Sequence, residues 1–189
     1  MRSLAFRLLV VCLFGSLLVG CATNIELAPI DSARVAKVDV IDNRPADTKV
    51  YKSSDWAKAV RYLGDDSFST PPLKQLAALL EVRLKPGSFT LQVDQFRVID
   101  IFPIRKGQAM AGAFFGIGIA LSVRVPTNDD SIQCIFSGKL GTHLIETAEG
   151  ETYKLSPVGV MVANDPSFKS AVNGCLSKLA QKIADEADR

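Results

Sequence analysis

The chain has few of the residues that build most catalytic and metal centres. Its 189 residues include a single histidine, His143, and four cysteines. It contains no CxxC, HExxH or GxSxG motif, so the usual residue patterns of metal-dependent and serine-nucleophile enzymes are missing. His143 stands alone on a predicted strand, a position typical of a structural histidine. We therefore expect a protein that is not an enzyme, with no catalytic residue, no metal site and no cofactor.

Charge of one sign is also scarce. The 22 lysine and arginine residues nearly balance the 20 aspartate and glutamate residues, which leaves a formal net charge of +2. Arg2 and Arg7 lie within the first 20 residues, where there is no acidic residue, so the rest of the chain has a net charge of 2 − 2 = 0. Because nucleic-acid binding relies on a basic surface that neutralises phosphates, this balance predicts no nucleic-acid partner.

Long apolar runs are missing as well. The two apolar runs of the chain are both shorter than the roughly 20 residues that a membrane-spanning helix needs. The stretch from Leu8 to Gly20 has an apolar region of only about 12 residues and follows two arginines, which is the layout of a secretory signal peptide.

A lipobox, Leu18-Val19-Gly20-Cys21, ends this stretch. In such a motif the cysteine thiol is the nucleophile that accepts a diacylglyceryl group, and the signal peptidase needs a small residue before the cut. We therefore predict a signal peptide over residues 1–20 and lipid attachment at Cys21. The alternative is an uncleaved N-terminal anchor.

The predicted lipid anchor also implies where in the cell the protein is located. More than one acyl chain on Cys21 would give stable membrane attachment, whereas a single chain gives only marginal binding. Ala22, and not aspartate, follows the cysteine, which favours sorting to the outer membrane with the protein facing the periplasm. Residues 21–32, with Pro29 among them, are predicted to form a lipidated tether that lets the domain stand off the lipid surface.

Two cysteines remain in the predicted mature domain, because Cys12 lies in the signal peptide and Cys21 takes the lipid. Cys134 lies on the apolar face of an alternating strand, and Cys175 lies on the apolar stripe of a helix, so both are predicted to point inward. In an oxidising compartment, such a pair suggests one disulfide, which would close a loop of about 40 residues and stabilise the fold by about 4 kcal/mol. Two unpaired buried thiols are the alternative.

The remaining pattern predicts a single α+β domain over residues 33–189, with a mostly antiparallel sheet and two helices packed on one face. The elements expected along the chain are a strand at 36–40, a long excursion or loose hairpin at 46–69, a helix at 70–84, a strand from Phe89 with a bulge near Gln95, a strand around Cys134, a hairpin of 140–145 and 152–155 about a turn at 148–150, and a helix starting at Asp165.

The segment 109–123 is unusual for a globular domain. It carries no charge and contains Gly112, Gly116 and Gly118. Three interpretations stay open: a glycine-interrupted loop that enters a buried strand, a contact with a protein partner, and insertion into the bilayer beside the anchor. The glycines do not form a nucleotide-binding fingerprint, because the third glycine and a capped helix start are missing.

The chain resembles the small bacterial outer-membrane lipoproteins of the YajG-like type and, more loosely, the auxiliary lipoproteins of envelope transport systems. The resemblance lies in the lipobox, the strand and turn of Val38 to Arg44, the helix from Pro71 to Leu84 followed by Pro86-Gly87, and the C-terminal helix. It implies a non-catalytic component of envelope machinery and no catalytic residues.

We therefore expect a lipid-anchored envelope lipoprotein that binds an envelope protein or a transport or secretion assembly. The alternative is a lipid- or cell-wall-binding lipoprotein that uses the apolar segment 109–123. An enzyme would be favoured only if the fold brought His143 and two carboxylates into one pocket. The adjacent carboxylates Asp65-Asp66 and Asp129-Asp130 are expected to be solvated loop residues.

Overall fold

The computed structural model describes residues 24–55, 60–101, 130–154 and 165–188. The predicted signal peptide, Cys21 and the apolar segment 109–123 lie outside these residues. In the part of the chain that is described, no helix has the length and apolar character needed to cross a membrane.

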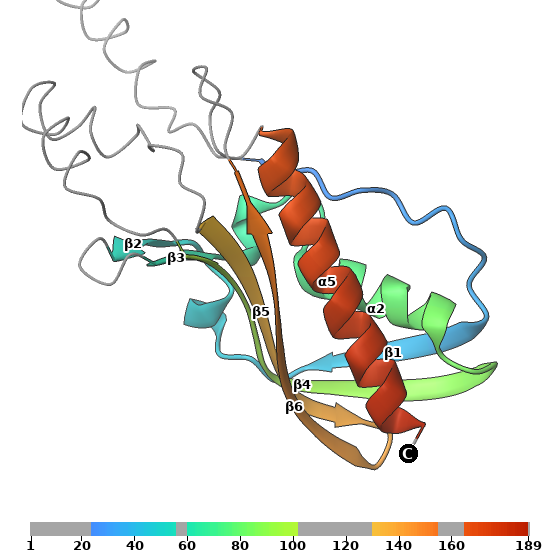
Figure 1. Cartoon of the computed structure of the whole chain (residues 1–189). Helices are drawn as coiled ribbons and strands as arrows, with labels where there is room; N and C mark the ends of the chain where they lie inside the picture. The colour runs from blue at the N-terminus through green and yellow to red at the C-terminus, as the bar shows by residue number, and fades with distance from the viewer. Residues whose placement is uncertain (1–23, 56–59, 102–129, 155–164, 189) are drawn as a thin grey trace, which may run out of the picture.

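A mixed, six-stranded sheet forms one layer of the domain (Figure 1). Its central strand is β4, which pairs with β5 along one edge and with β1 and β3 along successive parts of the other. Every pairing is antiparallel except that of β1 with β4. The strands are β1 (Ala36–Asp42), β2 (Lys52–Asp55), β3 (Val60–Leu63), β4 (Gly87–Ile101), β5 (Asp130–Leu140) and β6 (His143–Tyr153).

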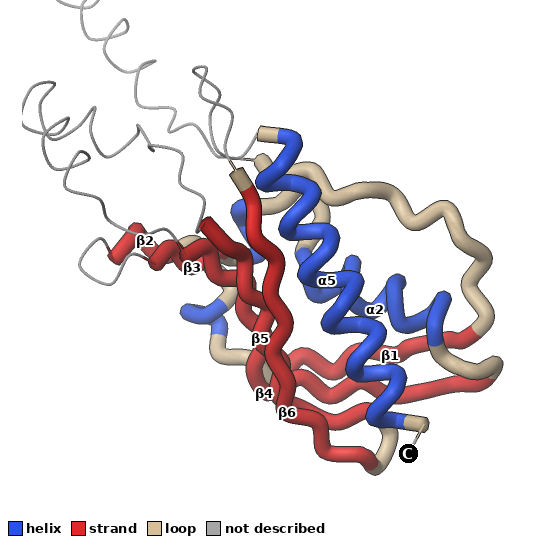
Figure 2. The backbone as a smooth tube through the Cα atoms, viewed as in Figure 1, coloured by secondary structure: helices blue, strands red, loops and turns tan. Residues whose placement is uncertain are grey.

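Two helices, α2 (Pro72–Arg83) and α5 (Pro166–Ala187), form the second layer on one face of the sheet (Figure 2). The predicted α+β fold with two helices on one face is therefore confirmed. Short 3-10 helices, η2 (Ala46–Thr48) and η3 (Asp65–Ser67), flank the β2–β3 hairpin, which confirms the loose hairpin predicted for 46–69.

Helix α5 follows its sequence signals closely. The carboxylate of Asp165 accepts hydrogen bonds from the backbone N–H groups of Ser167 and Phe168, so it caps the helix as predicted. The predicted inward stripe is fully buried; its members are Phe168, Val172, Cys175, Leu179 and Ile183.

The predicted bulge in the central strand is also confirmed. Val93 pairs with Gly138 and Gln95 pairs with Ser137, so Asp94 is the extra residue. Because one inserted residue reverses the alternation of side chains, the apolar residues on both sides of the bulge face the helices. These residues are Leu91, Val93, Phe96 and Val98.

The predicted turn at 148–150 is wrong. Those residues lie in the middle of β6, where Gly150 pairs with Gln133, and the chain reverses instead at Gly141 and Thr142. Gly141 has a φ of 62°, a conformation that the tight two-residue hairpin loops favour and that other residues rarely adopt. The strands on both sides are therefore longer than predicted, with eleven residues each.

Within the segment 21–32 that is predicted to form a tether, residues 25–28 pack against the domain. Ile25 is only 1% exposed and forms a parallel bridge with Phe68. Farther along, Ala28 donates its backbone N–H to Asn173 Oδ1 at 2.9 Å and accepts a hydrogen bond from Gln75 Nε2 at 2.7 Å. This segment therefore packs against the helical layer and does not act as a free spacer.

Candidate protein-binding groove along strand β1

Strand β1 leaves one edge of the sheet open, because β4 is its single partner strand among the described residues. The hydrogen bond from Asn43 N to Val93 O shows that the odd-numbered residues of β1 bond to β4. In a parallel pair the alternate residues then direct their backbone groups away from the sheet. Glu81 Oε1 accepts one of these N–H groups, from Val38, at 3.3 Å. The outward groups of Val40 have no partner within the described part of the chain.

The same edge carries exposed apolar side chains. Six large hydrophobic residues are exposed in the described part of the chain, and Val35, Val40 and Ile41 are three of them. Soluble proteins usually protect open strand edges with charges, because such edges pair readily with other chains. On β1, before Asp42, the charged side chains are Lys37 and Asp39. They form an ion pair with each other at 2.9 Å, so their opposite charges offset each other along this edge.

A groove of about 470 Å³ runs between β1 and α2. The small side chains of Ala77 and Ala78 leave this space open on the helix side. An ion pair of 2.9 Å between Arg34 and Glu81 lies at its rim. The apolar part of the lining is completed by Val38, Val40, Pro71 and Leu73. The groove therefore offers apolar contacts beside unpaired backbone groups.

Arg44 forms the charged end of the groove and is only 6% exposed. Its Nε and Nη2 donate to Asp42 at 2.9 and 3.1 Å, and its Nη1 and Nη2 donate to Asp65 at 3.4 and 2.8 Å. Nη1 also reaches the carbonyl oxygen of Phe96, and the guanidinium lies 5.6 Å from the centroid of that ring. All five N–H donors of this buried guanidinium are thus accounted for.

These contacts change the acid–base behaviour of Asp42. Burial alone would raise the pKa of its carboxyl, but hydrogen bonds from Arg44 and Lys49 outweigh burial and lower the pKa to about 2. The cluster joins the end of β1 to η3 through Asp65 and holds the strand at the groove. The expectation that Asp65 is simply solvated is therefore wrong.

A second buried ionic cluster lies where the chain leaves β4. Asp100 is fully buried and accepts hydrogen bonds from Arg61 Nη2 at 2.8 Å and from the hydroxyl of Tyr153 at 2.6 Å. The guanidinium of Arg61 lies 5.6 Å from the centroid of the Phe168 ring, so the cluster connects β3, β4, β6 and α5. Asp130 is also fully buried, and the expectation that it is solvated is wrong.

The structure separates His143 from these carboxylates. His143 is exposed beside the β5–β6 turn and pairs with Leu140, whereas Asp100 pairs with Ile132. Those two positions on β5 are eight residues apart, which corresponds to about 26 Å. No group of three histidine, cysteine, aspartate or glutamate side chains among the described residues could hold a metal ion.

Cys134 and Cys175 both point inward and are fully buried, as predicted. Both thiols are free in the structure, so the disulfide stays a prediction. Burial raises the pKa of the Cys134 thiol, and a hydrogen bond with the neighbouring Cys175 raises it further. Cys175 Sγ lies 3.3 Å from the carbonyl oxygen of Glu149, which accepts its weak hydrogen bond. The pair thus links α5 to the sheet.

The open edge was not predicted from the sequence, although the strand that forms it was. The sequence does show an arginine, Arg44, shortly after this strand, which could have indicated an ion pair at the strand's end. Its partner Asp65 is 21 residues farther along the chain, so the pairing could not be read from the local sequence.

In comparisons with known proteins, no family model, no curated protein and no solved structure matches the chain. The resemblance to YajG-like lipoproteins thus remains an expectation.

Proposed function

We propose that the protein is a non-catalytic lipoprotein of the cell envelope, anchored at the outer membrane through Cys21 and facing the periplasm. In this proposal it binds an extended segment of an envelope protein, or of a transport or secretion assembly, along β1. The observation that carries the proposal is an open strand edge with exposed apolar side chains beside a groove.

An extended segment fits this edge for two reasons. A partner strand can form main-chain hydrogen bonds with outward groups of β1, and its alternate side chains can enter the adjacent groove. The small residues Ala77 and Ala78 leave room for medium-sized apolar side chains. Because Glu81 already accepts the N–H of Val38, the partner would find its free main-chain groups at Val40, toward Arg44.

Crosslinking in intact cells tests this proposal. A photo-crosslinking residue at Val40 should capture an envelope protein, whereas the same residue at Leu144, which is also exposed but lies on the opposite edge of the sheet, should capture little or none. A Val40→Lys variant should compete poorly for the partner, because it places a charge at the apolar groove. Equal capture from both positions, or none from either, would contradict partner binding at β1.

The second candidate function is lipid or cell-wall binding through the segment 109–123. One observation favours it: Ile101 and Asp130, between which this segment runs, lie at the same end of the sheet as the start of α5 and the buried Ile25. Native mass spectrometry of the mature domain, purified without detergent, should then show bound lipid. A protein that carries no lipid in this measurement but is crosslinked at Val40 would support partner binding instead.

A further inference from the structure

Ile25 is a fixed point close to the predicted lipid anchor. It is part of the hydrophobic core, and its backbone is bonded on both sides, from Ile25 N to Ser67 O at 2.9 Å and from Ser69 N to Ile25 O at 3.0 Å. Such a residue cannot move away from the domain without breaking these hydrogen bonds and exposing apolar surface. Ile25 is therefore a point at which the chain is fixed to the domain.

Only four peptide units separate Cys21 from Ile25. A fully extended chain of this length spans about 14 Å. If Cys21 carries lipid, as the proposed function requires, Ile25 cannot lie farther than this from the headgroup region. The distance is small compared with the length of the domain, so the anchor restricts which part of the domain can be near the bilayer.

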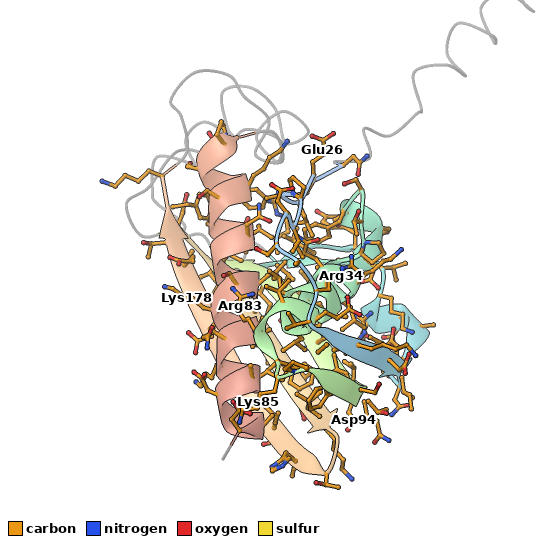
Figure 3. The ribbon with its side chains drawn as sticks, turned by 90° about the vertical axis from the view of Figure 1, so that its right-hand side faces the viewer. Glu26, Arg34, Arg83, Lys85, Asp94 and Lys178 are labelled. Carbon is orange, nitrogen blue, oxygen red and sulfur yellow. The ribbon has the colours of Figure 1, made fainter. Side chains whose placement is uncertain are left out.

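The contacts of α5 show which end of the domain this is. Glu26 lies 3.7 Å from the ammonium of Lys169, in the first turns of α5. At the other end, the ammonium of Lys85 lies 3.0 Å from Asp188. Asp188 is 19 residues beyond Lys169, which corresponds to about 28 Å of helix. Figure 3 shows Glu26 and Lys85 at opposite ends of the molecule, with Arg34 of the groove rim between them.

We propose that the end of the domain where α5 begins faces the lipid surface and that the opposite end faces the periplasm. This orientation rests on the proposed lipidation of Cys21. It also places the start of β1 away from the bilayer, because Ala36 pairs with Gly87, two residues after Lys85. The groove is then open to a partner that approaches through the periplasm.

Spin labels at graded distances test the orientation. Lipidated mature protein is placed on vesicles of phosphatidylethanolamine and phosphatidylglycerol that contain a nickel-chelating lipid. Labelled cysteines replace Glu26, Lys178 or Lys85, whose side chains are 74%, 53% and 72% exposed. The native thiols of Cys134 and Cys175 are fully buried, so they should not react with the label. Relaxation enhancement by nickel should decrease in the order Glu26, Lys178, Lys85, and it should be several-fold larger at the first position than at the last.

A spacer variant provides the matched control. A flexible Gly-Ser insertion between Cys21 and Ile25 should abolish most of this difference, because it lengthens the chain between lipid and core. Equal enhancement at Glu26 and Lys85 in the protein without the insertion, or the reverse order, would overturn the orientation.

The failures of the two proposals are distinguishable. An unmodified Cys21, seen by mass spectrometry of the mature protein, would refute both the anchor and the orientation. Loss of crosslinking at Val40 with the label gradient intact would refute the partner site and leave the orientation standing.

Discussion

Replacement of Arg44 by methionine should destabilise the domain at neutral pH by an amount that depends on pH. Arg44 lowers the pKa of Asp42 from 3.8 to about 2, together with Lys49. At about 1.4 kcal/mol per pKa unit, this shift would correspond to about 2 kcal/mol of stability in a site closed to water. Asp42 is an exposed residue whose side chain is 26% exposed, so solvent screening reduces its contribution to about 1 kcal/mol. The loss of the contacts to Asp65 should add to the cost.

The direction of the pH dependence follows from the lowered pKa. Asp42 binds a proton more readily in the unfolded chain than in the folded one, so its contribution is complete above pH 3.8. The contribution is lost as the pH falls through about 2. The difference in unfolding free energy between the native protein and Arg44→Met should therefore narrow as the pH is lowered through this range.

Urea unfolding between pH 7 and pH 2 measures this difference. The matched control is Arg97→Met, because Arg97 is an exposed arginine that also lies over an aromatic ring, 6.0 Å from the centroid of Tyr62. We expect it to cost less than about 1 kcal/mol at every pH. An Arg44→Met variant that costs no more than this control, or whose cost is independent of pH, would refute the assigned role of the Arg44 cluster.

Three further predictions concern packing and covalent structure. Gly138→Ala should cost about 2 kcal/mol or more in urea unfolding, because its added Cβ would lie 2.1 Å from the carbonyl oxygen of Gln92; Gly150→Ala, whose nearest contact is 3.5 Å, should be tolerated far better. Asp165→Ala should lower stability by about 1 kcal/mol through loss of the helix cap, and Asp165→Asn should restore most of it. If Cys134 and Cys175 are bonded in the envelope, the denatured native protein should show no free thiol, and reduction should cost about 4 kcal/mol; two titratable thiols would contradict the disulfide.

The elements predicted best from sequence are those whose signals are local. In α5, the cap at Asp165 and the buried stripe ending at Ile183 are both set by residues within the helix, so its position could be read without knowledge of the sheet. The bulge at Asp94 also left a local mark, because the apolar alternation changes phase there.

The sequence-based predictions failed where local signals pointed to the wrong structure and contacts with residues far along the chain set the actual one. Gly141 and Gly150 are both plausible turn residues, and only the pairing of β6 with β5 over eleven residues shows which of them reverses the chain. Pro29 suggested a free spacer after Cys21, but the bridge between Ile25 and Phe68 depends on a residue 43 positions away.

The sequence by itself determined the positions of the two helices and the inward direction of Cys134 and Cys175, because these depend on short patterns of residue type. The anchor at Cys21 rests on such a pattern too and stays a prediction. Only the tertiary structure decided that β1 lies at an open edge and that Arg44 is buried between Asp42 and Asp65. Strand order and ion pairing are set by the free energy of the whole packed domain, in which residues far apart in the chain compete for the same partners.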